Sequence, residues 1–260
     1  MSAPERPPRR AALLQRPVVR PEAEAVAPLP RIEPVRKPVR VPVRESVRQA
    51  SSRLEPPDRD AIEALPPFEM LGLDRIVLVD TPDAVAAASA ELGDSPVLGF
   101  DTESKPTFVR GEISDGPHLV QFATLERAWL FPLRGAACID AVMALLASRT
   151  IAKAGFGLDS DRTLLAARLG AAPNRIVDLD NAFRAMGYRR SIGLKSAVAM
   201  VFGQRFVKSK KIGTSNWASP RLNERQLLYA ANDAYAAIRV HDALVRRGDP
   251  GIATLTEAAT

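Results

Sequence analysis

The stretch Val97-Leu98-Gly99-Phe100-Asp101-Thr102-Glu103 joins an apolar run to two carboxylates. The apolar run predicts a strand, and side chains alternate between the two faces of a strand, so Asp101 and Glu103 project to the same face. Carboxylates held that close repel each other unless a cation lies between them. Hard oxygen ligands on a rigid strand suit Mg²⁺ or Mn²⁺. The stretch therefore predicts a metal site at a strand end, although a solvated strand end would show the same Asp-x-Glu pattern.

On both sides of this stretch, from Ile76 onward, short apolar runs alternate with longer amphipathic segments. The apolar runs predict strands at residues 76–79, 97–102, 119–123, 128–132, 151–155 and 175–178. The amphipathic segments predict helices at 82–92, 138–147, 160–169, 179–186, 194–201 and 223–245. Hairpin-like strands come first, followed by strands and helices in alternation. This order predicts an α/β fold with a mixed β-sheet flanked by helices.

The N-terminal quarter of the chain has a different composition. Residues 1–67 hold 14 of the 22 prolines, interleaved with Arg, Glu and Val, and show neither strand nor helix periodicity. Such a segment cannot bury enough apolar surface to offset its ordering entropy. We expect a disordered, Pro/Arg-rich tail at 1–67, a folded domain at 68–248 and a short C-terminal tail at 249–260. The Pro-Val-Arg repeats between residues 34 and 44 could contact a nucleic acid or a protein, or could be solvated without a specific contact.

Charge and cysteine content limit the setting of the protein. The formal net charge of +6 suits a polyanionic partner. Nearly all of that charge lies in residues 1–60, so a basic groove on the domain would have to be local. Cys138 is the only cysteine, which excludes an intrachain disulfide and makes a reducing, cytoplasmic setting the expectation. No apolar run approaches the roughly 20 residues of a membrane-spanning helix, so we expect no membrane partner.

A second acidic group lies between a predicted strand and a predicted helix. The residues Gly155-Phe156-Gly157-Leu158-Asp159-Ser160-Asp161 lead into an apolar helical face, which places Asp161 in the first turn. A carboxylate there could simply be stabilised by the helix dipole. Asp159, two residues earlier, could be the helix cap.

A third acidic group lies on the predicted C-terminal helix, in Tyr229-Ala230-Ala231-Asn232-Asp233-Ala234-Tyr235. Tyr229 and Asp233 are four residues apart and so lie on one helical face. They could be an ordinary surface pair, but the apolar flanks indicate burial. A buried aspartate with no basic partner nearby in the sequence requires a metal or hydrogen bonds to compensate its charge.

Taken in order, these three pieces resemble the three exonuclease motifs of the ribonuclease D and Werner-type 3′–5′ exonucleases. That family belongs to the proofreading-exonuclease group of the ribonuclease H-like fold. Leu119-Val120-Gln121-Phe122-Ala123 is similar to a further family strand, and Ser215-Asn216-Trp217-Ala218 is similar to the pattern that precedes the last motif. The resemblance covers about residues 76 to 246 and implies a ribonuclease H-like α/β domain.

The resemblance also implies an activity and a set of site residues. It makes Asp101, Glu103, Asp161 and Asp233 the ligands of two divalent cations, Mg²⁺ or Mn²⁺, and Tyr229 the residue that orients the attacking water. Asp161 fits the motif better than Asp159, because two residues separate it from the apolar helical face. The implied function is metal-dependent hydrolysis of phosphodiester bonds from the single-stranded 3′ ends of DNA or RNA.

Several further residues are candidates for contact with the substrate. Thr102 occupies a place typical of the family, and three aromatic residues could stack on terminal bases or could belong to the core: Phe108, Phe156 and Trp217. Lys208, Lys210 and Lys211 precede the Ser-Asn-Trp segment and could follow a phosphate backbone, although a solvated loop would show the same run.

Two other functions remain open at this point. A catalytically silent nucleic-acid-binding module could keep the same fold, and loss of an acidic residue would be its signature. All four acidic residues and the tyrosine are present. An unrelated two-metal phosphatase acting on mononucleotides would hydrolyse free nucleotides and be indifferent to chain length.

Overall fold

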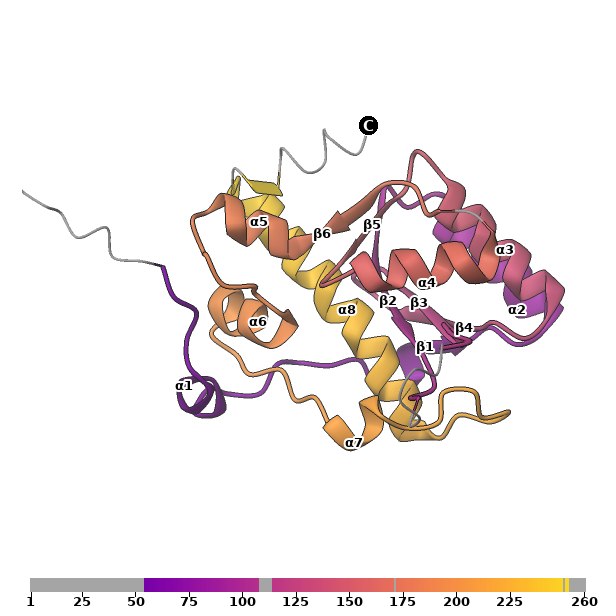
Figure 1. Cartoon of the computed structure of the whole chain (residues 1–260), viewed down its shortest axis with the longest axis horizontal. Coiled ribbons are helices and arrows are strands. Elements are labelled where there is room, and N and C mark those ends of the chain that lie inside the picture. The colour runs from indigo at the N-terminus through magenta and orange to yellow at the C-terminus, as the bar shows by residue number, and fades with distance from the viewer. Residues whose placement is uncertain (1–53, 108–113, 171, 250, 253–260) are drawn as a thin grey trace, which may run out of the picture. The chain divides into compact units, whose positions relative to one another are not determined.

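The computed structural model describes residues 54–107, 114–170, 172–249 and 251–252. These residues form a mixed six-stranded sheet with helices on both faces (Figure 1). The predicted α/β class is confirmed, and so is the mixed sheet.

The sheet has strand order β1-β4-β3-β2-β5-β6. Its strands are β1 (Ile76–Leu78), β2 (Val97–Glu103), β3 (Leu119–Ala123), β4 (Ala128–Pro132), β5 (Ala152–Gly155) and β6 (Ile176–Asp178). β3 pairs antiparallel with β2 and β4, and the remaining pairs are parallel. β2 therefore lies inside the sheet, and the carboxyl ends of β1, β2, β4, β5 and β6 share one edge.

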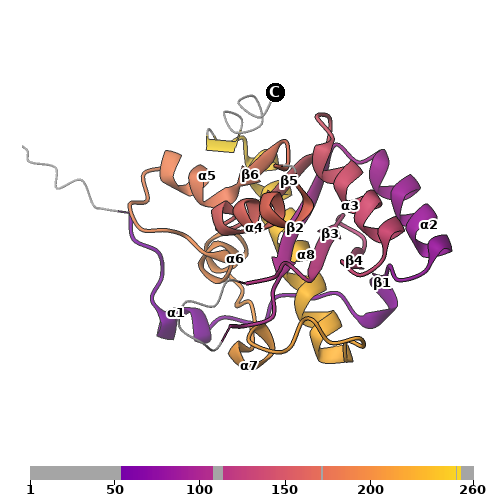
Figure 2. The same cartoon turned by 45° about the vertical axis from the view of Figure 1, so that its right-hand side comes forward.

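The helices cover the sheet from two sides. They are α1 (Arg59–Glu63), the 3₁₀-helix η1 (Leu73–Arg75), α2 (Pro82–Gly93), α3 (Ala136–Ala147), α4 (Asp159–Leu169), α5 (Leu179–Ala185), α6 (Leu194–Phe202), α7 (Lys210–Gly213) and α8 (Glu224–Arg247). Helix α8 crosses one face, while α2, α3 and α4 lie over the other (Figure 2). In the described part of the chain, no helix is long and apolar enough to cross a bilayer.

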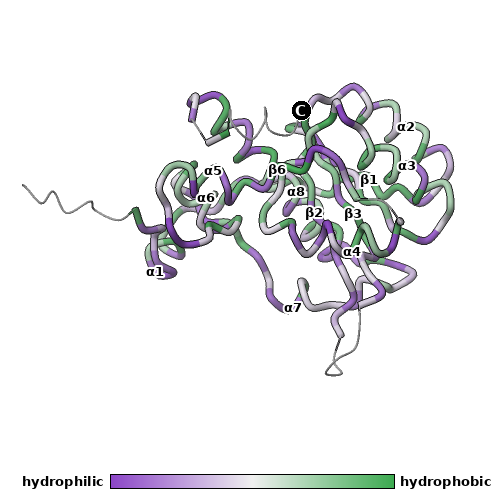
Figure 3. Tube along the Cα trace, turned by 45° about the horizontal axis from the view of Figure 1, so that its top comes forward, coloured by the Kyte–Doolittle hydropathy of each residue, from purple (hydrophilic) through white to green (hydrophobic). Residues whose placement is uncertain are grey.

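Alternating side chains of the strands divide the core into two halves. Val120 and Phe122 of β3 pack with α2 and α3, whereas their neighbours Leu119 and Ala123 pack with α8. In Figure 3 the hydrophobic colour gathers inside the layers, whereas the tube around α7 is purple to white. The strand period of 2 thus sends one set of residues toward each helical layer.

Helix α8 begins and ends with standard capping groups and lies very close to the sheet. Asn223 and Gln226 form a capping box at its start, and Gly248 ends it in a left-handed conformation. On β2, a Cβ atom added to Gly99 would overlap the carbonyl oxygen of Ala234 and lie 3.0 Å from the Cβ of Ile238. The glycine and the alanines of α8 therefore permit the close approach that brings α8 to the end of β2.

Described residues beyond both predicted domain limits have ordered structure. Residues 1–53 lie outside the described residues, but helix α1 falls within the segment 1–67 that we predicted to be a tail. The Arg205 guanidinium donates to the carbonyl of Glu63 at 2.9 Å, so this helix contacts a residue far along the chain. At the other end, Ile252 is buried in the core although we placed it in the tail 249–260. Local composition could reveal neither the hydrogen bond to Glu63 nor the burial of Ile252, because both depend on residues that are distant in the chain.

Candidate active site

Three acidic residues meet where the end of β2 faces α8. Asp101, Glu103 and Asp233 each offer a carboxylate oxygen, and these oxygens all lie within 4.8 Å of one another. The period of β2 places the first two on the α8 side of the sheet, and the close approach at Gly99 brings Asp233 to them. Asp233 is fully buried, whereas Asp101 and Glu103 are partly buried.

Asp161 approaches from the other face of the sheet. It lies in the first turn of α4 and accepts a hydrogen bond from the hydroxyl of Thr102. Thr102 lies between Asp101 and Glu103 on β2, so its side chain points away from theirs. The hydroxyl thereby ties Asp161 to the strand that carries Asp101 and Glu103. Asp159 is the first helical residue, and Leu158 takes the cap position without a side-chain hydrogen bond, so the cap role we considered for Asp159 is wrong.

A carboxylate that the sequence did not single out holds the start of α4. Asp178, at the end of β6, accepts hydrogen bonds from the backbone amides of Gly157 at 3.2 Å and Leu158 at 2.9 Å. Gly157 has a φ of 66°, which favours glycine. Asp178 therefore fixes the turn that delivers Asp161. In the sequence, Asp178 could have been noticed as an acidic residue at the end of the predicted strand 175–178.

Burial and mutual repulsion govern the protonation of the cluster. Burial, and then the carboxylate of Asp233, raises the pKa of Asp101. The pKa of Glu103 rises for the same first reason, with Asp101 and Asp233 adding to it. Burial also raises the pKa of Asp233, against the opposing charge of Lys208. The cluster resists full ionisation unless positive charge enters it.

Tyr229 lies one helical turn before Asp233, on the same face of α8. Its ring packs 5.9 Å from the ring of Trp217, centroid to centroid. Burial, followed by the charge of Asp233, raises the pKa of Tyr229 to about 12. The phenol therefore keeps its proton at neutral pH and can donate a hydrogen bond.

Lys208 supplies the positive charge that the local sequence around Asp233 lacks. Its Nζ lies 2.6 Å from Oδ2 of Asp233 and 5.0 Å from the centroid of the Tyr229 ring. The Asp233 oxygens accept no hydrogen bond of regular geometry from the described residues, so the Lys208 charge is their compensation. Burial alone would lower the pKa of Lys208, but the carboxylates of Asp233 and Asp101 outweigh it and raise that pKa.

The structure separates the predicted substrate contacts into different classes. Phe108 lies outside the described residues. Phe156 lines a cavity of about 230 Å³ that also contains Asp101 and Asp233, while its ring lies 6.4 Å from that of Phe183. Lys210 and Lys211 are exposed on α7. These three described residues remain candidates for substrate contact.

Two of those predictions meet a structural objection. Trp217 is only 1% exposed and its indole donates to the carbonyl of Gly213 at 3.2 Å, so it is not free to stack on a base. Thr102 is also buried, and its hydroxyl is engaged with Asp161. Both side chains therefore support site residues instead of lining a surface. Single-sequence patterns could not distinguish the two roles, since burial depends on distant neighbours.

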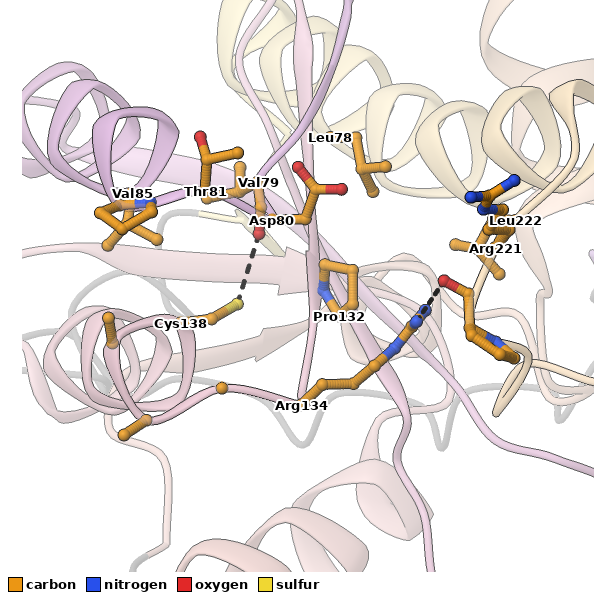
Figure 4. Close-up of a pocket in the computed structure, with 15 residues that line it drawn as sticks. Leu78, Val79, Asp80, Thr81, Val85, Pro132, Arg134, Cys138, Arg221 and Leu222 are labelled. Atoms are coloured by element: carbon orange, nitrogen blue, oxygen red, sulfur yellow. Dashed lines mark hydrogen bonds between the residues drawn. The ribbon is translucent and has the colours of Figure 1, made fainter.

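A larger cavity lies away from the acidic cluster. It measures about 560 Å³ and lies near the ends of β1 and β4 and the starts of α2 and α3 (Figure 4). Cys138 donates to the carbonyl of Val79 there, and Arg134 donates to that of Pro220. Asp80 is the only acidic residue in its lining. The smaller cavity beside Asp101 and Asp233 is the better candidate for chemistry, because the carboxylates converge there.

The donor set fits divalent cations of the hard type. The cluster presents carboxylate oxygens only, and burial raises the pKa of each member, so bound cations would relieve both repulsion and desolvation. Asp233 in particular has no hydrogen-bond donor of regular geometry in the described residues. The three carboxylates are therefore a candidate metal site beside the cavity of about 230 Å³.

The chain is similar to known 3′–5′ exonucleases. A family model described as 3′–5′ exonuclease matches residues 76–249. The bifunctional 3′–5′ exonuclease/ATP-dependent helicase WRN of Mus musculus is 31% identical over 163 residues, which are 62% of this chain and 12% of that protein. The chain thus spans a small part of that relative's length.

Solved structures show the same fold. The EXO domain of Aedes aegypti Nibbler superposes with a TM-score of 0.62 at 22% identity, covering 74% of this chain and 99% of that one. Ribonuclease D of Trypanosoma brucei in complex with RNA gives a TM-score of 0.62 at 21% identity, covering 76% of this chain and 69% of that one.

Proposed function

Because the chain belongs to the 3′–5′ exonuclease family, we propose that it removes nucleotides one at a time from the 3′ end of a nucleic acid strand. The observation that carries the proposal is the convergence of Asp101, Glu103 and Asp233, whose carboxylate oxygens lie within 4.8 Å of one another. Acidic residues so close and so buried are costly without a cation.

Two divalent cations, Mg²⁺ or Mn²⁺, would be held by Asp101, Glu103, Asp233 and Asp161. When bound, such ions lower the pKa of water and stabilise a departing oxygen. The strand and the two helices fix these four carboxylates, and Thr102 holds Asp161 in place. Rigid placement of the ligands is what allows a phosphate to be aligned for attack.

Tyr229 would orient the attacking water. Its phenol remains protonated at neutral pH, since its pKa lies near 12. A protonated phenol is a hydrogen-bond donor and positions the water without taking its proton. Asp233 lies one turn further along the same face of α8, so the helix itself carries the phenol toward the acidic cluster.

The substrate would be the single-stranded 3′ end of DNA or RNA. The relatives support this class, since one is named an exonuclease and helicase and another is a ribonuclease D bound to RNA. Phe156 lines the same cavity as Asp101 and Asp233, where it could stack on a base. Lys210 and Lys211, which follow Lys208 closely in the chain, are exposed. The choice between DNA and RNA belongs to the experiment.

A labelled-strand assay tests the proposal. Single-stranded and 3′-recessed DNA and RNA, labelled at the 5′ end, are incubated with the protein in Mn²⁺, Mg²⁺ or chelator. We expect a ladder that shortens from the 3′ end and disappears with chelator. Asp101→Asn and Asp233→Asn should abolish it, because each removes a charged ligand while keeping the shape of the side chain.

Asp140→Asn is the matched control, because Asp140 is exposed on α3, outside the acidic cluster. Its ladder should equal that of the unchanged protein. Strand binding without any shortening would contradict the proposal and favour a silent binding module. Release of phosphate from mononucleotides, with no effect on strands, would point to a phosphatase.

A further inference from the structure

A lysine ammonium group lies among the carboxylates proposed to hold cations. Nζ of Lys208 is 2.6 Å from Oδ2 of Asp233, and the same side chain lines the cavity that contains Asp101. Because carboxylate oxygens of Asp101, Glu103 and Asp233 lie within 4.8 Å of one another, an ammonium group in contact with Asp233 lies near the other two carboxylates as well. Lys208 therefore acts on the whole cluster and not only on its nearest partner.

The contact is difficult to explain as a simple stabilising ion pair. Asp233 is fully buried, and desolvation of both ions offsets much of their attraction. The ring of Tyr229 lies under the ammonium group, with its centroid 5.0 Å away, so the charge lies among the proposed catalytic groups. The Lys208 ammonium group therefore repels a metal cation that binds to Asp233.

The Lys208 side chain has room to leave Asp233. It is 32% exposed and lies in a segment between α6 and α7 with no regular helix or strand. The backbone just before Lys208 is fixed, since Phe206 is buried and Arg205 forms a β-bridge with Pro67. Rotation of the side chain into the adjoining cavity of about 230 Å³ would suffice, without movement of the fold.

We propose that Lys208 is a displaceable counter-ion of the acidic cluster, which holds Asp233 in the metal-free protein and yields it when a divalent cation binds. The inference rests on the proposed function of the cluster. Once displaced, the ammonium group lies at the edge of the same cavity, where a substrate phosphate would be its next partner. Lys208 would thus be a positioning residue that sets how tightly the cluster binds its cations.

Two consequences follow from the competition. Removal of the lysine charge should strengthen cation binding, because the cation no longer has to displace it. The same change should weaken the metal-free fold, because the carboxylates lose their counter-charge. A purely structural ion pair would produce only the second effect.

Calorimetric titration of the full chain with Mn²⁺ tests the proposal, with Lys208→Met, Lys208→Arg and Lys210→Met compared with the unchanged protein. We expect Lys208→Met to bind Mn²⁺ about tenfold more tightly or better, given the size of charge interactions at contact distance. Its melting temperature in chelator should fall. Lys208→Arg keeps the charge and should resemble the unchanged protein. Lys210→Met removes an exposed, screened charge and should alter affinity by less than about twofold.

A measurement on the unchanged protein covers the case in which Lys208→Met does not fold. An amine-reactive reagent followed by mass spectrometry should label Lys208 several times faster with Mn²⁺ than in chelator, with Lys210 as the internal reference. Equal labelling in both conditions overturns the inference. So does a folded Lys208→Met protein with unchanged or weaker Mn²⁺ affinity.

These outcomes are distinct from failure of the proposed function. An unchanged protein that neither binds Mn²⁺ nor shortens a strand overturns both proposals. An unchanged protein that does both, alongside an indifferent Lys208→Met variant, overturns only the role of Lys208.

Discussion

Thr102 connects residues on the two faces of the sheet. Its neighbours Asp101 and Glu103 point toward α8, whereas its own hydroxyl holds Asp161 of α4. The hydroxyl is thus a supporting group behind a candidate metal ligand. Residues of this kind commonly influence metal affinity and activity by about 10–100-fold.

Thr102→Val tests this supporting role, because valine keeps the shape and removes the hydroxyl. We expect kcat to fall about 10–100-fold with little change in KM, and Mn²⁺ affinity to weaken. Steady-state kinetics and calorimetry measure both. Thr163→Val, which removes an exposed hydroxyl bonded to the carbonyl of Asp159 on the same helix, should be almost silent. A rise in KM alone would instead make Thr102 a substrate contact.

The protonation of the cluster makes the metal-free protein sensitive to pH. The pKa is raised to about 10 for Glu103, about 8 for Asp101 and about 6 for Asp233, against roughly 4 for unfolded carboxyls. Between about pH 4 and pH 10 the folded protein binds more protons at these three carboxyls than the unfolded chain does, so these groups lower the stability of the fold as pH rises. His118 and His241, whose pKa burial lowers, oppose this trend below about pH 6.5.

Glu103→Gln isolates the contribution of the cluster from that of the histidines. In chelator, the variant should be as stable as the unchanged protein below about pH 4, where Glu103 is largely protonated in both the folded and the unfolded state. It should become more stable than the unchanged protein as pH rises toward about 9, because the glutamine cannot ionise. Denaturant unfolding at several pH values measures the difference. A difference that does not vary with pH would contradict the buried, repelling cluster.

At the scale of elements, the site depends on how close α8 lies to β2. Gly99 has no room for a Cβ atom, because the backbone of Ala234 and the side chain of Ile238 are already in contact with that space. Helix α8 carries both Asp233 and Tyr229. Any separation of helix and strand therefore moves those two groups away from Asp101 and Glu103.

Gly99→Ala should lower stability by about 1–3 kcal/mol, as expected for overpacking. It should also lower the rate of strand shortening by up to roughly 100-fold, since a displacement of about 1 Å in a site can have an effect of that size. Thermal unfolding and the strand-shortening assay measure the two effects. Gly93→Ala is the control, because a Cβ there meets nothing within 4 Å, and it should be neutral or slightly stabilising. Equal behaviour of the two variants would contradict the close approach.

At the scale of the whole molecule, the described fold begins before the first strand. Phe68 and Leu71 are buried, and the backbone of Leu71 pairs with the amide of Asn232, with 2.7 Å between its nitrogen and Oδ1. Phe68 also donates its amide to the carbonyl of Arg205 at 2.9 Å. The segment before β1 is therefore part of the domain and lies against the helix that carries Asp233.

Truncation separates this segment from the residues before it. A chain that starts at residue 54 should keep the melting temperature and the kcat of the full chain, since the buried residues of the described core begin at Phe68. A chain that starts at residue 76 should lose at least about 3 kcal/mol of stability, through loss of Phe68 and Leu71 from the core. Calorimetric melting compares the three proteins. Equal melting of the two truncated chains would show that the segment is dispensable.

The sequence by itself determined the strands and the longer helices, the family and the acidic candidates, whereas the short helices α1, η1 and α7 were not predicted. Short apolar runs located all six strands of the described sheet within a residue or two, because strands covered by helices on both faces are apolar along their length. Asp101 and Glu103 share a face because side chains alternate along a strand, and the spacing of Tyr229 and Asp233 follows from the helical turn.

Only the tertiary structure decided which distant groups meet. The pairing of Lys208 with Asp233, the link from Thr102 to Asp161 and the contact of Leu71 with Asn232 were not predicted, and the choice between core and substrate contact was left open for Trp217. Each joins residues that are far apart in the chain or depends on what packs over them. Periodicity reports which face a side chain occupies, whereas its partner is fixed by the packing of separate elements against one another.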